Sequence, residues 1–354
     1  MKLFDDKRVL ITGGTGSLGK ILVKRLLDGD LGMPSRVLIF SRDEAKQHTL
    51  RVEYFNLIAT KDPKIRDRFK EVVRFRIGNV RQFESVASAL KDIDIVFNAA
   101  ALKQVPACEE FPFEAIQTNV HAAQNIVQSI KQYNLPVEIV VGISTDKACK
   151  PVNVMGMTKA IQERIFVQGN LECKQTRFVC VRYGNVLASR GSVVPLFHQQ
   201  IQNGGPVTIT TTGMTRFLLS LNQAVDTVFA AIEHGRPGET FIPIVPSAKM
   251  VDLAEVLIED RSIKIEVIGI RPGEKTHEIM VSEEEVFRTV QRGEYYAILP
   301  NLAELQPDES IHTPLEKEFS SADVLMGKAE IRELLVKNNL MVGDSEEYQA
   351  ELIR

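Results

Sequence analysis

The sequence predicts an α/β protein with a Rossmann-type, doubly wound parallel sheet and a smaller mixed C-terminal domain. Short apolar runs alternate with amphipathic stretches through the first half of the chain, and this alternation is typical of βαβ units. A glycine-rich turn directly follows the first apolar run. After about Tyr183 the alternation ends, and glycine and proline become frequent. We therefore expect a first domain over residues 1–185 and a second domain over residues 186–354.

The apolar runs give the predicted elements in chain order. The first predicted strand covers residues 8–12 and the first helix covers residues 18–27. The other predicted strands cover residues 36–40, 72–77, 93–98, 138–143 and 178–182. The other predicted helices cover residues 83–90, 115–133, 221–233, 250–258 and 328–338. A segment near residues 214–235 is expected to return to the first domain.

Composition and charge limit the class of protein. The chain has 354 residues and a net charge of −3, so we expect more than one core and no nucleic-acid or anionic-membrane partner. The cysteines form no C-x-x-C pair and the six histidines are scattered, so no metal site is expected. The sequence has no run of about 18 apolar residues and begins almost at once with a strand and a loop. We expect a cytoplasmic protein with neither a signal peptide nor a membrane span.

The turn after the first strand has the form of a phosphate-binding loop. It reads T-G-G-T-G-S-L-G over residues 12–19. Gly13 would allow the sharp turn, Gly16 the approach of a pyrophosphate, and Gly19 close packing of helix on strand. The helix that follows offers free N–H groups to the anion. The loop predicts a dinucleotide site with contacts from Gly13, Thr15, Gly16, Ser17, Leu18 and Gly19.

The end of the second strand distinguishes NAD from NADP. An acidic residue there binds the ribose 2′-hydroxyl of NAD, whereas an arginine suits the 2′-phosphate of NADP. The strand ends in Phe40-Ser41-Arg42-Asp43, and Ser41 and Arg42 can bind a phosphate. Asp43 comes slightly late for the ribose role but could still take it. We therefore expect NADP, with contacts here from Ser41, Arg42, Asp43 and Lys46.

A set of motifs that follow one another along the chain narrows the class of protein further. F-S-R-D-E at 40–44 is followed by N-A-A-A-L-K-Q-V-P at 98–106, S-T-D-K-A at 144–148, P-V-N-V-M-G-M-T-K at 151–159, R-Y-G-N-V at 182–186, R-G-S-V-V-P-L-F at 190–197, M-T-R-F at 214–217 and R-P-G-E-K at 271–275. The set resembles the extended short-chain dehydrogenase/reductases, and within them the UDP-N-acetylglucosamine 4,6-dehydratases of bacterial polysaccharide synthesis. The closest resemblance is to the short, soluble, C5-inverting capsular type, from about residue 3 to about residue 285.

The resemblance implies a reaction in which NADP is regenerated at each turnover. The C4 hydroxyl of the sugar is oxidised by hydride transfer, the C5 proton becomes acidic beside the new ketone, and water leaves from C6. The hydride returns to C6, and the inverting branch reprotonates C5 on the opposite face. The implied substrate is UDP-N-acetylglucosamine or a close UDP-sugar, and the product is a UDP-2-acetamido-2,6-dideoxy-4-hexulose. A homo-oligomer is also implied, because related enzymes are often hexamers.

The resemblance assigns the central chemistry to Asp146 and Lys147, which follow a predicted strand end. Asp146 would assist loss of the C6 hydroxyl, and Lys147 would be the C5 base. A lysine base needs a lowered pKa, which burial near the positive ring of the cofactor would supply. The C4 proton would go to Lys147 or to a water held by Thr145.

The Y-x-x-x-K motif common in this superfamily is altered, because Met155 stands at the tyrosine position while Lys159 keeps the lysine. A thioether can neither donate nor accept a proton in catalysis, so Met155 cannot be the base for the C4 hydroxyl. Some members of the dehydratase group also carry methionine there. Lys159 would still hold the nicotinamide ribose and lower nearby pKa values.

Further contacts are expected around both ligands. Asn79 replaces the aspartate that is usual beside the adenine, and Asn119 is interpreted as a structural hydrogen-bonding residue. The other expected cofactor contacts are Val80, Ala99, Ala100, Ala101, Lys103, Lys159, Tyr183 and Val186. The expected substrate contacts are Lys103, Asn185, Val193, Thr208, Arg216, Arg271 and Glu274. Arginine at 216 and 271 suits the diphosphate.

Three alternatives stay open. A C5-retaining dehydratase shares the Asp146–Lys147 pair, although the wording of the motifs at 182–193 and 214–217 favours the inverting branch. A UDP-sugar 4-epimerase would need a tyrosine where Met155 stands and has no use for a C5 base. A noncatalytic NADP-sensing protein would keep the glycine loop and lose the sugar side, which the motif R-P-G-E at 271–274 argues against.

Overall fold

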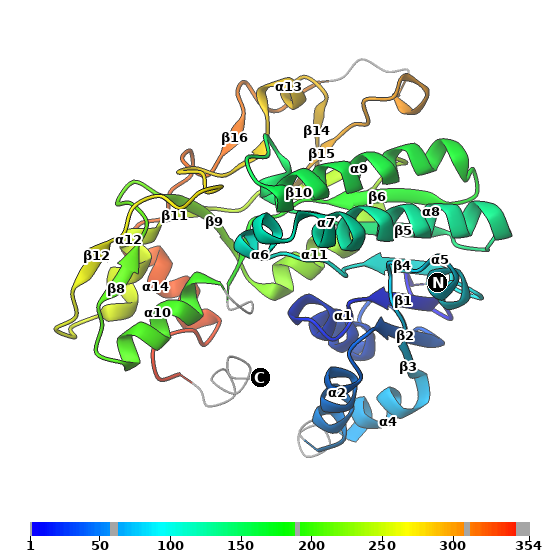
Figure 1. Cartoon of the computed structure of the whole chain (residues 1–354), viewed down its shortest axis with the longest axis horizontal. Helices are drawn as coiled ribbons and strands as arrows, with labels where there is room; N and C mark the ends of the chain where they lie inside the picture. The colour runs from blue at the N-terminus through cyan, green and yellow to red at the C-terminus, as the bar shows by residue number, and fades with distance from the viewer. Residues whose placement is uncertain (1, 57–62, 188–191, 308–311, 345–354) are drawn as a thin grey trace.

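A nine-stranded sheet forms the centre of the molecule (Figure 1). The computed structural model describes residues 2–56, 63–187, 192–307 and 312–344. The strands follow one another across the sheet in the order β14-β15-β10-β6-β5-β4-β1-β2-β3. Their bounds are β1 (Arg8–Thr12), β2 (Arg36–Ser41), β3 (Val73–Ile77), β4 (Ile95–Asn98), β5 (Ile139–Ile143), β6 (Arg177–Val181), β10 (Thr240–Pro243), β14 (Thr289–Arg292) and β15 (Tyr295–Ile298).

The strand order is that of a doubly wound sheet. From β1 in the middle the chain moves outward through β2 and β3, and then returns to β4 on the other side of β1. All neighbours from β3 to β10 are parallel, whereas β15 runs antiparallel to β10 and β14. The carboxyl ends of β1 and β4 therefore flank the point where the winding changes direction, which is where ligands bind in such folds. The fold class predicted from the sequence is confirmed.

Helices cover both faces of this sheet. One face packs against α1 (Ser17–Asp28), α2 (Glu44–Asn56), α4 (Pro63–Val72) and α11 (Leu221–His234). The other face packs against α5 (Phe83–Ala89), α8 (Ala122–Tyr133) and α9 (Val154–Glu172). Because central strands such as β4 and β5 are buried on both faces, their sequences are apolar without alternation.

The predicted helix over residues 115–133 is interrupted. The structure has α7 (Pro112–Ala115), then a π-helical turn η1 (Ile116–His121), and only then α8. Asn119 lies in the π-helical turn, where its amide accepts from the N–H of Leu102 at 2.9 Å and donates to the carbonyl oxygen of Leu102 at 3.0 Å. Asn119 therefore has the structural role expected, and the wider turn gives its side chain room to clamp the segment after β4.

The longest helix, α9, has no counterpart among the predicted elements. Much of its buried side is polar, since Lys159, Gln162 and Glu163 are all less than a tenth exposed. A helix is recognised in a sequence by the spacing of its apolar residues. A polar buried side removes that signal, so the prediction missed α9 for a physical reason.

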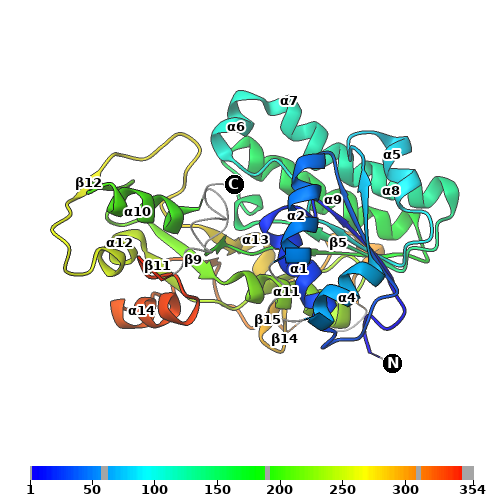
Figure 2. The same cartoon turned by 90° about the horizontal axis from the view of Figure 1, so that it is seen from below.

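A smaller lobe lies to one side of the sheet in both views (Figures 1 and 2). It contains a three-stranded sheet of β11 (Ser247–Lys249), β9 (Thr215–Leu219) and β7 (Asn185–Val186), and a pair of β12 (Ile265–Val267) and β8 (Val207–Ile209). Its helices are α10 (Val193–Gln202), α12 (Met250–Ile258) and α14 (Lys328–Lys337), which share one apolar core. The remaining elements are α6 (Val105–Glu110), η2 (Asp146–Ala148), β13 (Ile279–Val281), α13 (Glu283–Val286), η3 (Ala303–Leu305) and β16 (Phe319–Ser320).

Residues beyond 185 contribute to both parts of the molecule. β10, β14 and β15 extend the large sheet, and α11 packs against α1. The division of the chain at residue 185 stays a prediction. Three strands of the large sheet nevertheless come from the range expected for the second domain. One of them, β10, pairs in parallel with β6, so β6 is not an edge strand.

A buried arginine joins the sheet to the C-terminal segments. Arg182, directly after β6, is 3% exposed, and its guanidinium lies 2.7 Å from Glu163 of α9 and 2.9 Å from Glu285 of α13. It also donates to the carbonyl oxygen of Met280 at 2.7 Å. Ser144, directly after β5, donates to Glu163. Burial alone would lower the pKa of Arg182, but the two carboxylates raise it well above its ordinary value.

We expect Arg182→Met to lower the free energy of unfolding by about 3–5 kcal/mol, because two buried carboxylates lose their cation. Urea unfolding followed by circular dichroism measures this difference. Arg164→Met changes an exposed arginine of α9 and should stay within about 0.5 kcal/mol of the parent protein. Equal stability of the two variants would contradict the role given to Arg182.

Candidate active site

The glycine loop lies between β1 and α1, where the winding of the sheet changes direction. Gly13 has a φ of +67°, and a Cβ there would lie 2.8 Å from the Cα of Ala100. A Cβ on Gly19 would lie 2.4 Å from the Cα of Gly14. The backbone therefore requires glycine at both positions, and the loop lies directly against the segment that follows β4.

The N-terminus of α1 has free donors. Gly16 is the N-cap residue and provides no side-chain cap, so the N–H groups of the first turn, which begins with Ser17 and Leu18, can meet an anion. Thr15 lies half-buried in the turn before them. This arrangement fits the pyrophosphate of a dinucleotide.

Small side chains follow β4 beside the loop. Ala99, Ala100 and Ala101 are half-buried, and the N–H of Ala100 donates to the hydroxyl of Thr12 at 3.1 Å. That hydroxyl donates to Asn98 at 2.9 Å and so links the ends of β1 and β4. The side-chain nitrogen of Asn98 is buried without a hydrogen-bond partner among the described residues. The segment thus combines little side-chain volume with an unused donor.

At the end of β2, Arg42 is exposed while Asp43 is engaged by its own helix. Asp43 accepts from the N–H of Lys46 at 3.0 Å and pairs with the ammonium of Lys46 at 3.1 Å, so it caps α2. These bonds to Lys46 hold the pKa of Asp43 below its usual value. The hydroxyl of Ser41 accepts from Gln47 at 3.0 Å. Arg42, which is one of the residues expected to select the cofactor, therefore presents its charge to solvent.

Asn79 and Val80 follow β3. The amide oxygen of Asn79 accepts from the N–H of Arg81 at 3.1 Å, which leaves one lone pair for another donor. Val80 is buried, and its carbonyl oxygen accepts from Asn125 at 2.9 Å. Both residues stabilise this turn, and their contacts to an adenine stay predictions.

The turn after β5 brings three of the predicted catalytic residues, Thr145, Asp146 and Lys147, within hydrogen-bond distance of one another. The hydroxyl of Thr145 donates to Oδ1 of Asp146 at 2.8 Å and accepts from the N–H of Lys147 at 3.4 Å. Asp146 is fully buried, and its Oδ1 also accepts from Nζ of Lys147 at 3.1 Å. Its Oδ2 has no hydrogen-bond partner within the described ranges.

Glu278, which the motifs do not single out, completes this cluster. It directly precedes β13, is 1% exposed, and its Oε1 lies 3.3 Å from Nζ of Lys147. Burial disfavours the ammonium of Lys147, but the carboxylates of Asp146 and Glu278 outweigh burial and raise its pKa above the ordinary value. This direction is opposite to the lowered pKa expected from the sequence, because the second carboxylate comes from a distant part of the chain.

The start of α9 lies directly against the turn after β5 that carries Asp146 and Lys147. Asn153 caps the helix by accepting from the N–H of Gly156 at 2.8 Å. A Cβ on Gly156 would lie 2.1 Å from the carbonyl oxygen of Lys147, so this contact requires glycine. Met155 is 5% exposed and packs in an apolar cluster with Cys108 of α6. Its thioether therefore serves as an apolar contact. Gly156 lies within the motif at 151–159 but is not among the predicted site residues.

Lys159 lies one turn farther along α9 and is 4% exposed. Its ammonium donates to the carbonyl oxygen of Ile143 at 2.7 Å and to Gln162 at 2.9 Å. Two of its three N–H donors are therefore used, and one is left for a ligand. Burial lowers the pKa of Lys159 to about 8.

The segment after β6 leads from the sheet into the smaller lobe. Tyr183 is buried, which raises its pKa. Asn185 and Val186 form β7, and Oδ1 of Asn185 is buried without a partner among the described residues. Residues 190–191 of the motif at 190–197 lie outside the described ranges, and Val193 begins α10.

Arg216 of β9 lies beside the cluster of Asp146, Lys147 and Glu278. It is 7% exposed, donates to the carbonyl oxygen of Thr276 at 3.1 Å, and its Nε lies 4.0 Å from Glu278. These contacts give Arg216 structural partners within the protein. Its binding of a diphosphate stays a prediction.

The other predicted substrate residues lie on the smaller lobe or on loops. Thr208 accepts from Gln200 at 2.7 Å. Arg271 is exposed and lies 4.0 Å from Glu274. Lys103 is exposed on the segment between β4 and α6. Their contacts to a UDP-sugar stay predictions.

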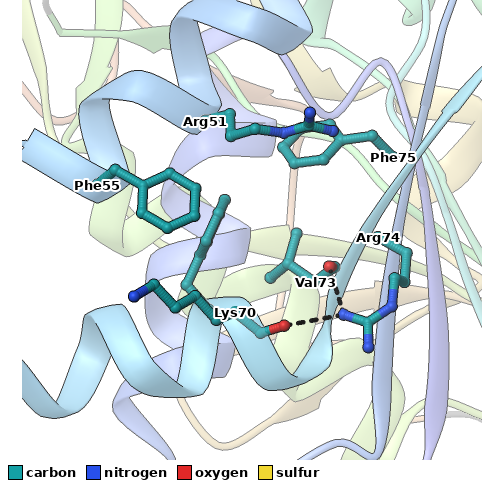
Figure 3. Close-up of a pocket in the computed structure, with 7 residues that line it drawn as sticks. Arg51, Phe55, Lys70, Val73, Arg74 and Phe75 are labelled. Atoms are coloured by element: carbon teal, nitrogen blue, oxygen red, sulfur yellow. Dashed lines mark hydrogen bonds between the residues drawn. The ribbon is translucent and has the colours of Figure 1, made fainter.

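A separate hollow lies at the β3 edge of the sheet, between α2 and α4 (Figure 3). The guanidinium of Arg51 lies 4.9 Å from the centre of the Phe75 ring, and Arg74 donates to the carbonyl oxygens of Lys70 and Val73. None of the residues that line it belongs to the predicted site. We assign it no function.

Other classes of site are not found in the described part of the chain. There, no three His, Cys, Asp or Glu side chains are grouped so that they could hold a metal ion. In the same ranges, no helix combines the length and apolar character needed to cross a bilayer. The homo-oligomer and the cytoplasmic location stay predictions.

We expect Gly156→Ala to destabilise the protein, although alanine normally favours a helix by about 1 kcal/mol over glycine. The added methyl group would meet the carbonyl oxygen of Lys147 and force α9 away from the turn, at a cost of about 1–3 kcal/mol. Thermal unfolding measures the difference. Gly213→Ala is the control, because a Cβ there meets nothing within 4 Å. A more stable Gly156→Ala protein would contradict the close approach.

Comparisons with known proteins extend over most of the chain. A family model described as polysaccharide biosynthesis protein matches residues 9–300. The chain is 43% identical over 309 residues to a UDP-N-acetylglucosamine 4,6-dehydratase (inverting) of Campylobacter jejuni, with 86% of each chain covered. It is 44% identical over 301 residues to a UDP-glucose 4-epimerase of Rickettsia akari, with 84% of each covered. The solved structure of Pen from Bacillus thuringiensis has a TM-score of 0.84 and 35% identity, covering 96% of this chain and 99% of that one.

The match to the family model includes the glycine loop, the turn after β5 and Glu278, all of which lie within residues 9–300. The resemblance to extended short-chain dehydrogenase/reductases, and among them to UDP-N-acetylglucosamine 4,6-dehydratases, is confirmed by the Campylobacter jejuni relative. Since the family model covers most of its length, this chain belongs to the polysaccharide biosynthesis protein family.

Proposed function

We propose that this protein is a UDP-N-acetylglucosamine 4,6-dehydratase that inverts C5 and uses NADP. The observation that carries the proposal is the contact of Asp146 with Lys147, 3.1 Å apart in the turn after β5. Elimination across C5 and C6 needs a base and an acid within reach of adjacent carbons, and this pair offers both. The Campylobacter jejuni relative, which is 43% identical, carries the name of this activity.

The residues around the glycine loop fit NADP. The first turn of α1 would hold the pyrophosphate close to Gly13, and the exposed Arg42 would bind the 2′-phosphate. Lys159 would give its remaining N–H to the nicotinamide ribose. The chemistry that NADP supplies when bound is reversible hydride transfer, out of sugar C4 and back into C6.

A proton shift within the pair would prepare both catalytic groups. The neutral amine of Lys147 would first take the proton of the C4 hydroxyl. Passing this proton from Nζ of Lys147 to Asp146, across 3.1 Å, restores the neutral amine and leaves a carboxylic acid. The amine of Lys147 then takes the C5 proton, and the C5–H electrons form the C5–C6 double bond. Asp146 gives its proton to the departing C6 hydroxyl, which leaves as water. Lys147 then loses one proton while C5 gains one and the hydride returns to C6, so the pair ends as it began, as a neutral amine beside a carboxylate.

The proton of the C4 hydroxyl needs an acceptor other than Met155. The hydroxyl of Thr145 already donates to Asp146 and accepts from the N–H of Lys147, so it could hold a water only through its one remaining lone pair. We therefore assign the C4 proton to the amine of Lys147.

A 4-epimerase is the second candidate, because the Rickettsia akari relative, 44% identical, is named UDP-glucose 4-epimerase. Inversion at C4 requires no base at C5 and would leave the Asp146–Lys147 pair without a task. It would also proceed without a tyrosine at position 155. A C5-retaining dehydratase would use the same pair and differ only in the face of C5 that is reprotonated.

Incubation with UDP-N-acetylglucosamine and NADP in deuterium oxide separates these activities. We expect NMR spectra of a UDP-linked 6-deoxy-4-keto sugar with deuterium at an inverted C5. Retained configuration would identify the retaining enzyme, and UDP-N-acetylgalactosamine would identify an epimerase. Binding of NADP without any product would identify a sensing protein. Each of these three results contradicts the proposal.

Lys147→Ala should slow turnover by at least about 100-fold, as expected for loss of a general base. Lys150→Ala is the matched control, because Lys150 pairs at the surface with Glu283 and Glu318, each at 2.8 Å. The control should keep the parent rate in the same NMR assay. Normal turnover by Lys147→Ala would rule out Lys147 as the base.

Arg42→Ala should weaken NADP binding by about 10- to 100-fold, because a charge-assisted hydrogen bond to the 2′-phosphate is lost. The Kd for NAD, which lacks this phosphate, should change by less than about twofold. Isothermal titration with both dinucleotides measures the two constants. Equal weakening of NADP binding and NAD binding would show that Arg42 does not bind the 2′-phosphate.

A further inference from the structure

The cluster around Lys147 contains an acidic side chain to which the proposed reaction gives no task. Glu278 is 1% exposed, and its Oε1 lies 3.3 Å from Nζ of Lys147. The same nitrogen lies 3.1 Å from Oδ1 of Asp146. One amine is therefore shared by two buried carboxylates from distant segments of the chain.

The other cations near Glu278 are more distant and are anchored elsewhere. Nζ of Lys275 lies 3.9 Å from Oε2 of Glu278 and donates to the carbonyl oxygen of Cys149 at 2.6 Å. Nε of Arg216 lies 4.0 Å from Oε1 of Glu278, while its Nη1 donates to the carbonyl oxygen of Thr215 at 2.7 Å. Lys147 is thus the nearest of the three cations to Glu278, and the electrostatic effect of this carboxylate falls mainly on the lysine of the proposed pair.

The backbone of Glu278 is held independently of its side chain. Its N–H donates to the hydroxyl of Ser321 at 2.9 Å, and its carbonyl oxygen accepts from the N–H of Ser321 at 2.8 Å. Ser321 is fully buried, and its hydroxyl is also 2.7 Å from that of Thr215. The carboxylate is not needed for this anchoring, so an amide can replace it without loss of these bonds.

Both carboxylates beside Lys147 have an unused oxygen. Oε2 of Glu278 and Oδ2 of Asp146 are buried without a hydrogen-bond partner among the described residues. An unsatisfied buried acceptor lowers stability. Such a cost is typical of groups that serve chemistry rather than packing, which distinguishes Glu278 from an ordinary structural carboxylate.

We propose that Glu278 is a positioning residue for the dehydration, whose carboxylate holds the amine of Lys147 beside Asp146 and sets the pH at which this amine exchanges its proton. The inference rests on the proposed function for its effect on turnover. The two carboxylates favour the ammonium form of Lys147, so the neutral amine that acts as base forms at higher pH. Once Lys147 has passed the C4 proton to Asp146, Glu278 is the remaining charge beside Lys147 and stabilises the ammonium that forms when the C5 proton is taken.

Glu278→Gln tests the proposal, because it removes the charge and keeps the size and the backbone anchoring. Loss of an opposite charge at this distance should lower the pKa of Lys147 by about one to three units. The base must be neutral in the free enzyme, so the acidic limb of the kcat/KM profile should move to lower pH by a similar amount. Glu278→Asp, which keeps the charge, should move the limb less than half as far.

Glu318→Gln is the matched control, since it removes a carboxylate that pairs with Lys150 at the surface at 2.8 Å. Its pH profile should coincide with that of the parent protein. Thermal unfolding shows whether each variant is folded. If folded Glu278→Gln keeps the parent pH limb, or if Glu278→Asp moves it equally far, Glu278 is only structural and the proposal is wrong.

Chemical labelling of Lys147 tests the same point without turnover. Brief acetylation at a series of pH values, followed by peptide mass spectrometry, gives the midpoint at which the Lys147 amine becomes reactive. We expect a lower midpoint in Glu278→Gln and an unchanged one in Glu318→Gln. If the parent protein has no dehydratase activity, this shift still shows that Glu278 controls Lys147, so the two failures are told apart. An unmoved midpoint in Glu278→Gln overturns the inference.

Discussion

The buried guanidinium of Arg182 holds together the segments that meet at the proposed site. It connects the end of β6 to α9 through Glu163 and to α13 through Glu285. The residue before the catalytic turn, Ser144, donates to the same Glu163. The chain that enters α13 also carries Glu278, a few residues earlier. One cation therefore fixes the sheet, the helix and the C-terminal segment relative to one another, and the position of the catalytic turn depends on it.

Two clusters of charged side chains, one around Arg182 and one around Lys147, lie along these same segments. They differ in how many of their polar atoms have hydrogen-bond partners. The guanidinium of Arg182 meets two carboxylates and a carbonyl oxygen. In the cluster of Lys147, by contrast, Asp146 and Glu278 each keep a buried oxygen without a partner among the described residues. A satisfied network makes a fold rigid, whereas unsatisfied groups are costly. The first cluster stabilises the structure, and the second retains capacity for the donors of a substrate.

The features that could be predicted from the sequence are those whose signal is local. The glycine loop is recognised from the residues of the loop itself, and Asp146 and Lys147 are neighbours in the chain. Glu278 could not be found in this way, because its significance comes from a contact with Lys147 across the fold. The need for glycine at 156 likewise comes from the carbonyl oxygen of Lys147. α9 escaped prediction because polar residues occupy much of its buried side, so its apolar residues show no helical spacing.

The large sheet is completed late in the chain, and this has a consequence for how the protein can be made or divided. β6 is paired on its outer side by β10, and β10 in turn by β15. During synthesis on the ribosome, β6 presents an open edge until β10 at 240–243 has emerged, and β10 presents one until β15 at 295–298 has emerged. Open edges pair readily with other chains. A fragment that ends at residue 185 would keep that edge permanently. The part of the chain up to residue 185 is therefore not a transferable module, and fusions or truncations have to retain the C-terminal strands.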